Sequence, residues 1–519
     1  FQRGTHLILA DVQHFLLYAA GNACNNQILP KNRTENRIKI LKLLPLRGKD
    51  KTVSGSNQHS TLMLSLTVTP DHSVNYPEND TIAAIATAPG RAGIAVVKLS
   101  GPEAPAILQS LFRGKKNPAF FPRRMIHGCI TDSSKTVDEV LVSLMKAPHS
   151  YTGEDVVEIQ SHGGYAAAGA ILALVIEKGA RPAEPGEFTR RAFLNGRIDL
   201  TQAEAVMEIV AAEGKEHLRR AEKLMEGAFS LRIEKLLDEL VHSASLTELN
   251  IDFLDQGLEA IPRKELKNSI EYTMKTLDTM LESYTAAQRI KNGLRVAITG
   301  KVNSGKSSLF NTLLGRKRAI VNERPGTTRD WIEEKIELSG LPINLIDTAG
   351  LRETDDEIER EGVDEAKRFL RDADIVISLE EPDEEHRPVE NTPRESPKII
   401  PVVSKSDILD KRSKNKEILY ISSFTGEGIE TLLDAIITLA SPLINTGDSD
   451  SLVMVERHRL LLAETRDHLL GALLSLDEWS EEITALELRE AQSKLEEIIG
   501  RNISFDVLDD IFKNFCIGK

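Results

Sequence analysis

The 519-residue chain has few cysteines and no long apolar run. Its three cysteines, Cys24, Cys129 and Cys516, predict no disulfide framework and a reducing compartment. Cys516 belongs to a terminal CIGK sequence that lacks the aliphatic and last residues of a prenylation signal. The longest near-apolar stretch, 165–176, has twelve residues, which predicts a buried helix because a bilayer core of about 30 Å needs more. The sequence thus argues against a disulfide scaffold, a lipid anchor and a membrane partner, and its length predicts three or four domains.

The most informative pattern that is present is GKVNSGKSS, residues 300–308, directly after the apolar segment 294–299. A strand that ends in such a loop and continues into a helix aims backbone N–H groups and a helix N-terminus at phosphates. The GxxxxGKS spacing predicts that Lys306 reaches the outer phosphates of a nucleotide and that the Ser307 hydroxyl holds Mg²⁺. The predicted phosphate cradle contains Asn303, Ser304, Gly305, Lys306, Ser307 and Ser308.

Two motifs that follow fit the switch loops of a GTPase. Thr327 and Thr328, in RPGTTRD, offer the hydroxyl that completes the Mg²⁺ shell when a γ-phosphate is present. Asp347 follows the apolar segment 343–346 and is expected to hold the same shell, while the Gly350 amide meets the γ-phosphate. Hydrolysis of the γ-phosphate would then release both loops.

The next two motifs predict that the base is guanine. In SKSD, residues 404–407, the Asp407 carboxylate can accept paired hydrogen bonds from guanine, whereas adenine lacks those donors. Lys405 belongs to the same motif, and Ser422 and Ser423 fit the loop that closes over the base. GTPases of this class normally carry Asn where this chain has Ser404, and one lost buried hydrogen bond is worth roughly 0.5–1.5 kcal/mol. We therefore expect weaker GTP binding with the preference for guanine kept.

The residue that orients the attacking water is less clear from the sequence. Ras-like proteins place a Gln after the DTAG motif, and this chain has Leu351 there. The acid-rich segment downstream offers other partners, although a solvated acidic helix face would look the same. Spacing alone does not choose among Glu353, Glu357, Glu359 and Glu361.

These motifs, with others along the chain, resemble the MnmE (TrmE) family of tRNA-modifying GTPases. The resemblance covers about residues 80–519. It is more specific than the phosphate-loop pattern, because the PGEF/RAFLNG block and the terminal CIGK are not shared with other GTPases. The segments that carry it are 80–101, 151–164, 185–206, 300–362 and 515–519.

For the nucleotide site, the resemblance implies potassium-dependent hydrolysis in a homodimer. Family members bind K⁺ beside the phosphates, so that two G domains meet and the ion replaces an arginine finger. The matching positions are Asn303 and the loop 322–327, which includes Asn322, Arg324 and Thr327. The family's water-orienting acid matches Glu359, and Lys306 is the second catalytic residue expected.

The resemblance also implies a folate site before residue 198. The ligand would be 5,10-methylene-tetrahydrofolate, with 5-formyl-tetrahydrofolate as its analogue, and the matching residues are Lys98, Glu158, Arg197 and Lys519. Bacterial relatives usually have Arg where Lys98 stands, which exchanges a bidentate fork for a point charge. Cys516 would lie at the modification centre. The family acts on tRNA in a heterotetramer with MnmG, a partner that uses FAD and NADH.

The predicted fold is a multi-domain α/β protein with a folate-binding α/β domain, a split helical bundle and an inserted Ras-like P-loop G domain. Helical periodicity with few Gly or Pro supports the bundle. The predicted boundaries are 1–79 for a basic leader, 80–197 for the folate domain, 198–291 and 444–519 for the helical domain, and 292–443 for the G domain.

Charge separates the leader from the rest of the chain. Residues 1–70 hold nine Lys/Arg and three Asp/Glu, whereas the whole chain has a formal net charge of −14. An acid-poor basic leader predicts import into a chloroplast or mitochondrion, where the enzyme would be soluble. A disordered extension or a wrongly assigned start would look similar and would leave a bacterial-type cytoplasmic protein. The acidic remainder argues against broad electrostatic capture of tRNA.

Two classes of function follow. The first is the GTP-hydrolysing subunit of a complex that adds a (carboxymethyl)aminomethyl-type group to carbon 5 of the wobble uridine. The second is a GTP-binding assembly factor for ribosomes or RNA. The PGEF/RAFLNG block and the CIGK tail favour the first, while Ser404 slightly favours the second.

Overall fold

The computed structural model describes three regions of secondary structure within one of two compact units, the unit that begins at Tyr76. The described residues are 80–256, 262–301, 303–316, 332–347, 372–381, 397–409, 418–444, 453–478 and 480–518. The predicted leader lies outside them. Within the described residues, no helix combines the length and apolar character needed to cross a membrane.

The first region is a seven-stranded sheet with helices packed on it. The strand order is β3-β4-β5-β6-β2-β1-β7, and every neighbouring pair is antiparallel except β1 with β7. The strands are β1 (Ile82–Ile85), β2 (Ile94–Ser100), β3 (Phe112–Arg113), β4 (Ile126–Asp132), β5 (Lys135–Met145), β6 (Val156–His162) and β7 (Arg181–Pro182). The helices are α2 (Ala104–Leu111), the 3₁₀ turn η1 (Pro118–Phe120), α3 (Tyr165–Glu177) and α4 (Glu187–Leu194).

Helix α3 confirms a helix over the apolar stretch 165–176, with one correction. It buries Ala168, Ile171, Leu174 and Val175 in the core of the sheet, but Tyr165 at its start is exposed. Only one face of the helix is therefore buried.

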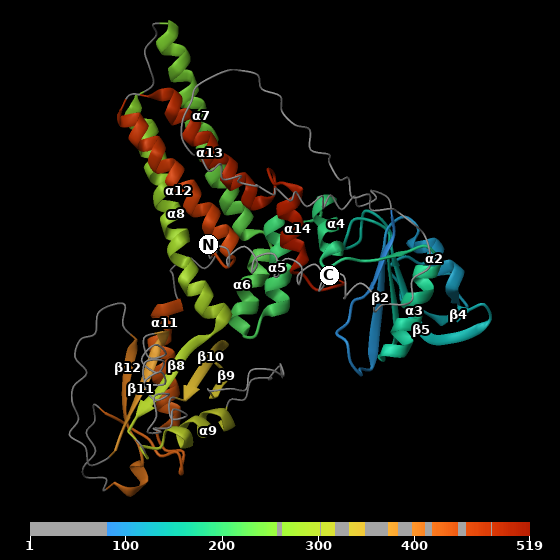
Figure 1. Cartoon of the computed structure of the whole chain (residues 1–519), viewed down its shortest axis with the longest axis horizontal. Helices are drawn as coiled ribbons and strands as arrows, with labels where there is room; N and C mark the ends of the chain where they lie inside the picture. Colours follow the sequence, from blue (N-terminus) through green and yellow to red (C-terminus); the bar gives the residue numbers. More distant parts are fainter. Residues whose placement is uncertain are drawn as a thin grey trace, which may run out of the picture. The chain divides into compact units, whose positions relative to one another are not determined.

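The second region is a bundle of helices from two separate parts of the chain (Figure 1). The first part gives α5 (Leu200–Ala211), α6 (Lys215–Met225), α7 (Ala228–Gln256) and α8 (Arg263–Asn292). The second part gives α12 (Glu456–Asp477), α13 (Glu481–Ile499) and α14 (Phe505–Lys513). Helices α7, α8, α12 and α13 share one apolar core. Asp199 and Gln202 form a capping box that fixes the start of α5.

The third region lies in sequence between α8 and α12 and has a six-stranded sheet in the order β13-β12-β11-β8-β10-β9. Only β9 and β10 pair antiparallel. Its elements are β8 (Leu294–Gly300), α9 (Lys306–Arg316), β9 (Ile332–Leu338), β10 (Leu341–Asp347), β11 (Ile375–Glu380), β12 (Lys398–Val403), the 3₁₀ turn η3 (Ser406–Ile408), β13 (Leu419–Tyr420) and α11 (Ile429–Ile444). Because α8 and α12 pack on each other, this region is an insertion into the helical bundle. Ala287 and Ile290 of α8 nevertheless belong to its core.

Candidate functional site

The predicted nucleotide residues meet at one edge of the six-stranded sheet. The phosphate loop follows β8, Asp347 ends β10, Ser404 follows β12 and Ser422 lies just beyond β13. These strands are parallel, so their carboxyl ends share an edge. Strand β8 lies between β10 and β11, where the strand order reverses, and ligands of open α/β sheets bind at such a point.

The loop after β8 is folded tightly around Lys306. A Cβ at Gly300 would lie 2.5 Å from the Leu379 carbonyl oxygen, so only glycine allows β8 to approach β11 this closely. Asn303 has a left-handed backbone with φ 68° and is exposed. The buried Lys306 ammonium donates to the carbonyl oxygens of Gly300 at 2.8 Å and Lys301 at 2.7 Å. The cation therefore lies inside the loop where phosphates are expected.

Ser307 and Asp347 form a pair of oxygen donors beside this loop. The Ser307 hydroxyl donates to the Asp347 carboxylate at 3.0 Å, and Asp347 is buried at the end of β10. A hydroxyl next to a carboxylate fits the hard oxygen ligands that Mg²⁺ prefers. The remaining ligands would come from phosphates and water, as is usual for this ion. Ser307, the residue after Lys306 in helix α9, is thus suited to hold Mg²⁺ as predicted.

The predicted base-binding loop lies against the phosphate loop. A Cβ at Gly305 would be 4.0 Å from the Cβ of Ser404. Ser404 is buried, and its hydroxyl donates to the Glu380 carbonyl oxygen at 3.2 Å. Lys405 has a left-handed backbone with φ 55°, and Asp407 is exposed in η3. The Ser404 hydroxyl therefore donates to the end of β11. An Asn at this position, as in the resembling GTPases, is expected to hydrogen-bond to the phosphate loop instead.

The segment after β13 completes this edge. The buried Ser422 hydroxyl accepts from the Thr425 amide at 3.1 Å, and the Ser423 carbonyl oxygen accepts from Thr312 of α9 at 3.3 Å. Ser308 lies in the first turn of α9. The other predicted residues lie outside the described part of the chain: Asn322, Arg324, Thr327, Thr328, Gly350, Glu359 and Lys519.

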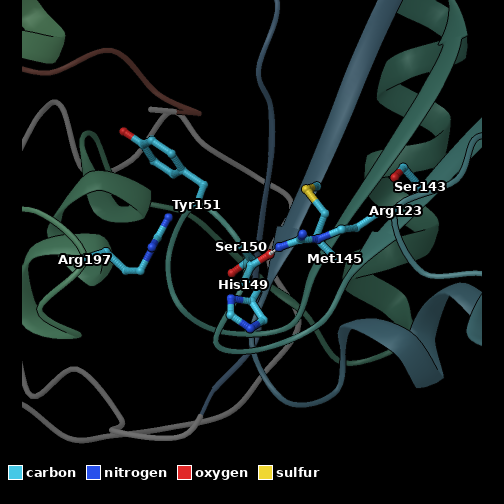
Figure 2. A pocket seen from close by; sticks show the side chains of 7 residues that line it. All are labelled: Arg123, Ser143, Met145, His149, Ser150, Tyr151 and Arg197. Carbon is cyan, nitrogen blue, oxygen red and sulfur yellow. Dashed lines mark hydrogen bonds between the residues drawn. The ribbon is translucent and has the colours of Figure 1, made fainter.

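A second site lies in the seven-stranded sheet region, as a pocket of about 390 Å³ (Figure 2). Arg197, one of the predicted folate residues, lines it on the side of Tyr151. The full lining is Arg123, Ser143, Met145, His149, Ser150, Tyr151 and Arg197.

Two more predicted folate residues lie next to this pocket. The Lys98 ammonium lies over the Tyr151 ring at 4.2 Å and over the Phe188 ring at 4.9 Å, which are cation–π distances. Glu158 of β6 faces Lys98 of β2 on one side and Ser143 of β5 on the other, so the three residues form a row across the sheet. A buried cation and a carboxylate beside this pocket match the acidic and polar groups of a folate. Burial also raises the pKa of Tyr151.

Sequence reasoning missed most of the lining. Tyr151 begins the YTGEDVVEIQ segment, so this block gave a signal for it, whereas Arg123 had none. Arg123 has a left-handed backbone with φ 61°, and its guanidinium donates to the His149 carbonyl oxygen at 2.7 Å. A non-glycine residue in this conformation next to a pocket is a common feature of functional sites.

The PGEFTRRAFLNG block connects this pocket to the end of the chain. Gly186 has φ 68°, and a Cβ there would lie 2.6 Å from the Phe512 carbonyl oxygen of α14. Arg190 of α4 pairs with Asp509 of α14 at 3.0 Å. The Asn195 amide donates to the Thr152 carbonyl oxygen at 2.7 Å, next to Tyr151.

A cluster of ion pairs connects α4 to the residues around β1 and β7. Arg181 and Arg191 bond to the Asp80 and Glu187 carboxylates, and Arg191 also reaches Glu154 at 3.2 Å. Burial would raise the pKa of Asp80, but hydrogen bonds from the two arginines hold it below its usual value. The cluster fixes α4, which carries Phe188, against the start of β1.

Cys516 lies near α4 and is exposed. Its carbonyl oxygen accepts from the Gly186 amide at 3.4 Å. A Cβ at Gly518 would lie 2.7 Å from the Ala86 Cα, so the tail lies against the end of β1. The tail thus reaches the sheet region, although Cys516 does not line the pocket.

Comparison with known proteins decides the family. Residues 81–197 match a family model described as "GTP-binding protein TrmE N-terminus", and residues 200–516 match one described as "MnmE helical domain". The chain belongs to the MnmE family of tRNA modification GTPases. The predicted resemblance and the predicted fold class are therefore confirmed.

This chain matches curated MnmE proteins over nearly the whole length of each relative. A tRNA modification GTPase MnmE of Syntrophus aciditrophicus (strain SB) is 43% identical over 458 residues, which is 85% of this chain and 99% of the relative. The MnmE of Alkaliphilus metalliredigens (strain QYMF) is 40% identical over 459 residues, with the same two shares. The MnmE of Geotalea uraniireducens (strain Rf4) is 40% identical over 455 residues, again with these shares.

Proposed function

We propose that this chain hydrolyses GTP as one subunit of a complex that modifies carbon 5 of the wobble uridine in tRNA. The observation that carries the proposal is that one chain of this family holds both a phosphate loop and a separate pocket, which Arg197 lines and which lies next to Lys98 and Glu158. An assembly factor that borrowed a G domain would not need the second site.

In the nucleotide site, each described residue has a role that its position supports. Lys306 leaves the carbonyl oxygens of Gly300 and Lys301 to bind the outer phosphates. Ser307 and Asp347 hold Mg²⁺, which would neutralise charge on the phosphates. Asp407 reads guanine. Glu359, which lies outside the described residues, would orient the attacking water, as the family resemblance implies.

Potassium is the second ion that we propose. Asn303 and the loop 322–327 would bind K⁺ beside the phosphates, and two chains would then meet through their G domains. GTP turnover should be several-fold faster in potassium than in sodium buffer of equal ionic strength. Equal rates in the two buffers, or an unchanged rate in Asn303→Ala, would contradict this assignment.

In the sheet region, the pocket would bind a one-carbon tetrahydrofolate. The cations Lys98, Arg197 and Lys519 would neutralise its carboxylates, and Glu158 would accept hydrogen bonds from its pterin. The folate supplies the carbon that is transferred. Cys516 lies close enough to α4 to belong to the same centre. We further propose a homodimer that joins an MnmG-type FAD and NADH protein in a heterotetramer, in a chloroplast or mitochondrion.

Mass spectrometry of wobble uridines tests the proposal. Transfer RNA from a line that lacks this chain should lose the modified uridine, and expression of the wild-type chain should restore it. Expression of Lys306→Ala should not restore it, although the protein accumulates. Unchanged wobble uridines in the line that lacks the chain would instead favour an assembly factor.

A further inference from the structure

One loop of the seven-stranded sheet region concentrates positive charge, although the chain as a whole is acidic. Residues 113–127, which we name the basic loop, contain five Lys/Arg and no Asp/Glu, while the whole chain has a net charge of −14. The sheet region as a whole, residues 80–197, holds 14 Lys/Arg and 11 Asp/Glu. The five cations of the loop are Arg113, Lys115, Lys116, Arg123 and Arg124, and all five are exposed.

The basic loop is compact because its two ends lie side by side. It leaves the sheet at β3 and returns at β4, and these two strands pair. A Cβ at Gly114 would lie 2.9 Å from the His127 carbonyl oxygen, and a Cβ at Gly128 would lie 2.5 Å from the Arg113 carbonyl oxygen. The five charges therefore lie on one short connection between two paired strands.

None of these five cations pairs with a carboxylate among the described residues. Arg113 donates to the carbonyl oxygens of Gln109 and Phe112, and Lys116 lies 5.4 Å from the Phe121 ring. These contacts leave the positive charge uncompensated. In the helical bundle, by contrast, most arginines form ion pairs: Arg219, Arg220, Arg263, Arg289, Arg457, Arg459, Arg466, Arg489 and Arg501.

The basic loop is also continuous with the pocket. Arg123 lines the pocket, and its amide donates to the Leu144 carbonyl oxygen of β5 at 2.7 Å. Its left-handed backbone, with φ 61°, turns the chain at this point. Arg124, the next residue, is exposed outside the pocket. A polyanion on the loop would thus reach the edge of the pocket.

We propose that the basic loop binds backbone phosphates of tRNA and places a nucleotide next to the one-carbon pocket. This inference rests on the proposed function, because tRNA is the polyanion that the proposed reaction needs. Uncompensated Lys and Arg on an exposed loop are the usual electrostatic footprint of nucleic-acid binding. An acidic protein partner fits less well, because a stable protein interface needs an apolar centre. Among the described residues of this loop, the five cations are exposed beside one exposed large hydrophobic side chain, Met125.

The test uses a triple charge reversal, Lys115→Glu with Lys116→Glu and Arg124→Glu, in the full chain. Arg123 is left intact because it lines the pocket. Binding of an unmodified tRNA transcript is measured by fluorescence anisotropy at several salt concentrations. At 0.1 M salt, we expect the affinity to fall by at least about tenfold, and the slope against log salt to fall by about three. GTP turnover, 5-formyl-tetrahydrofolate binding and the melting temperature should not change.

A matched control separates this surface from net charge. Lys235→Glu, Lys264→Glu and Lys275→Glu change three exposed lysines of α7 and α8, so the net charge falls by the same amount. This control should keep most of the affinity and the full salt slope. Equal loss in both triples would overturn the proposal, and so would no binding by the wild-type chain.

Other results distinguish the proposal from the function on which it rests. A loop triple that binds tRNA normally but no longer co-purifies with the flavin partner would show a protein-docking surface and would overturn the inference. If deletion of the chain left wobble uridines unchanged while tRNA binding still depended on the loop, the proposed function would fail and the RNA surface would stand.

Discussion

The candidate nucleotide site and the candidate folate pocket differ in how their residues are distributed along the sequence. Each part of the nucleotide site is a short loop after one strand, and parallel strands bring these loops to one edge. The pocket instead combines residues from several places: β2 and β6 carry Lys98 and Glu158, the loop before β6 carries Tyr151, and Arg197 follows α4. A site of the first kind can be read from local motifs. A site of the second kind needs the fold.

The largest expected effect tests the nucleotide site by itself. Glu359→Ala should reduce GTP hydrolysis by about 10²-fold or more, because a positioned acid–base group contributes this much. GTP affinity should persist, since Glu359 is not one of the predicted cradle residues 303–308. Single-turnover hydrolysis and nucleotide titration measure both quantities, with Glu357→Ala as the control. Normal hydrolysis by Glu359→Ala with loss in Glu357→Ala would move the role to Glu357.

A stability change outside both sites should come next in size. Arg457 and His458 of α12 bond to the buried Glu204 carboxylate of α5 at 2.8 and 2.6 Å. Burial would raise the pKa of Glu204, but its interactions with His458 and Arg457 lower it from 4.5 to about 2. The native carboxylate thus contributes stability that is complete above pH 4.5 and is lost as the pH falls toward 2. By linkage, the contribution is about 3 kcal/mol.

Glu204→Gln should therefore lower the free energy of unfolding by about 3 kcal/mol at pH 7. The difference from wild type should shrink as the pH falls from 4.5 to 2, because both proteins then carry a neutral side chain. Urea denaturation across this range measures it, and Glu248→Gln, in an exposed ion pair, is the control. A difference that grew on acidification would refute the assigned sign.

The pocket offers a third and smaller effect. Lys98→Ala should weaken binding of 5-formyl-tetrahydrofolate by about 10- to 100-fold, since hydrogen bonds to charged groups are worth roughly 1.5–3 kcal/mol. GTP affinity should stay the same if the sites are separate. Isothermal titration gives both affinities, and Lys146→Ala, a half-exposed lysine paired with Asp155, is the control. Loss of GTP affinity in Lys98→Ala would break the distinction between the sites.

The smallest effect concerns Ser404. Ser404→Asn should tighten GTP binding by about 0.5–1.5 kcal/mol without a change in base preference, because Asn regains a bond toward the base and the phosphate loop. Ser404 lies close to Gly305, so an Asn side chain at position 404 could reach the phosphate loop. Asn would also give up the hydroxyl bond to Glu380. Titration with a fluorescent GDP analogue decides: equal or weaker binding would mean that the loop has adapted to Ser.

The nucleotide residues predicted from the sequence meet at one sheet edge, while their role in binding stays a prediction. The sequence could bring them together for a physical reason. Gly300, Lys306 and Asp347 each act through the loop in which they stand, so their spacing already contains the geometry. The position of Tyr151 under Lys98 depends on strand pairing and on Phe188 of α4, which no local pattern contains. Arg123 was missed because its left-handed turn has no glycine or asparagine to mark it.

The helical bundle shows the same limit. Periodicity predicted helices on both sides of the insertion, but the extent to which α8 enters the core of the six-stranded region could not be read from it. Ser404 marks a different kind of limit. The motif predicted a lost hydrogen bond, while the new partner, the Glu380 carbonyl oxygen, depends on the end of a neighbouring strand.

The most direct test of the account is one binding experiment on the purified chain with two ligands. Isothermal titration of 5-formyl-tetrahydrofolate, with and without a saturating non-hydrolysable GTP analogue, reports both sites in a single sample. We predict one folate site per chain in either case, lost in Lys98→Ala and kept in Lys306→Ala. No folate binding, or folate binding that the GTP analogue displaces competitively, would contradict the claim that this chain holds two separate sites.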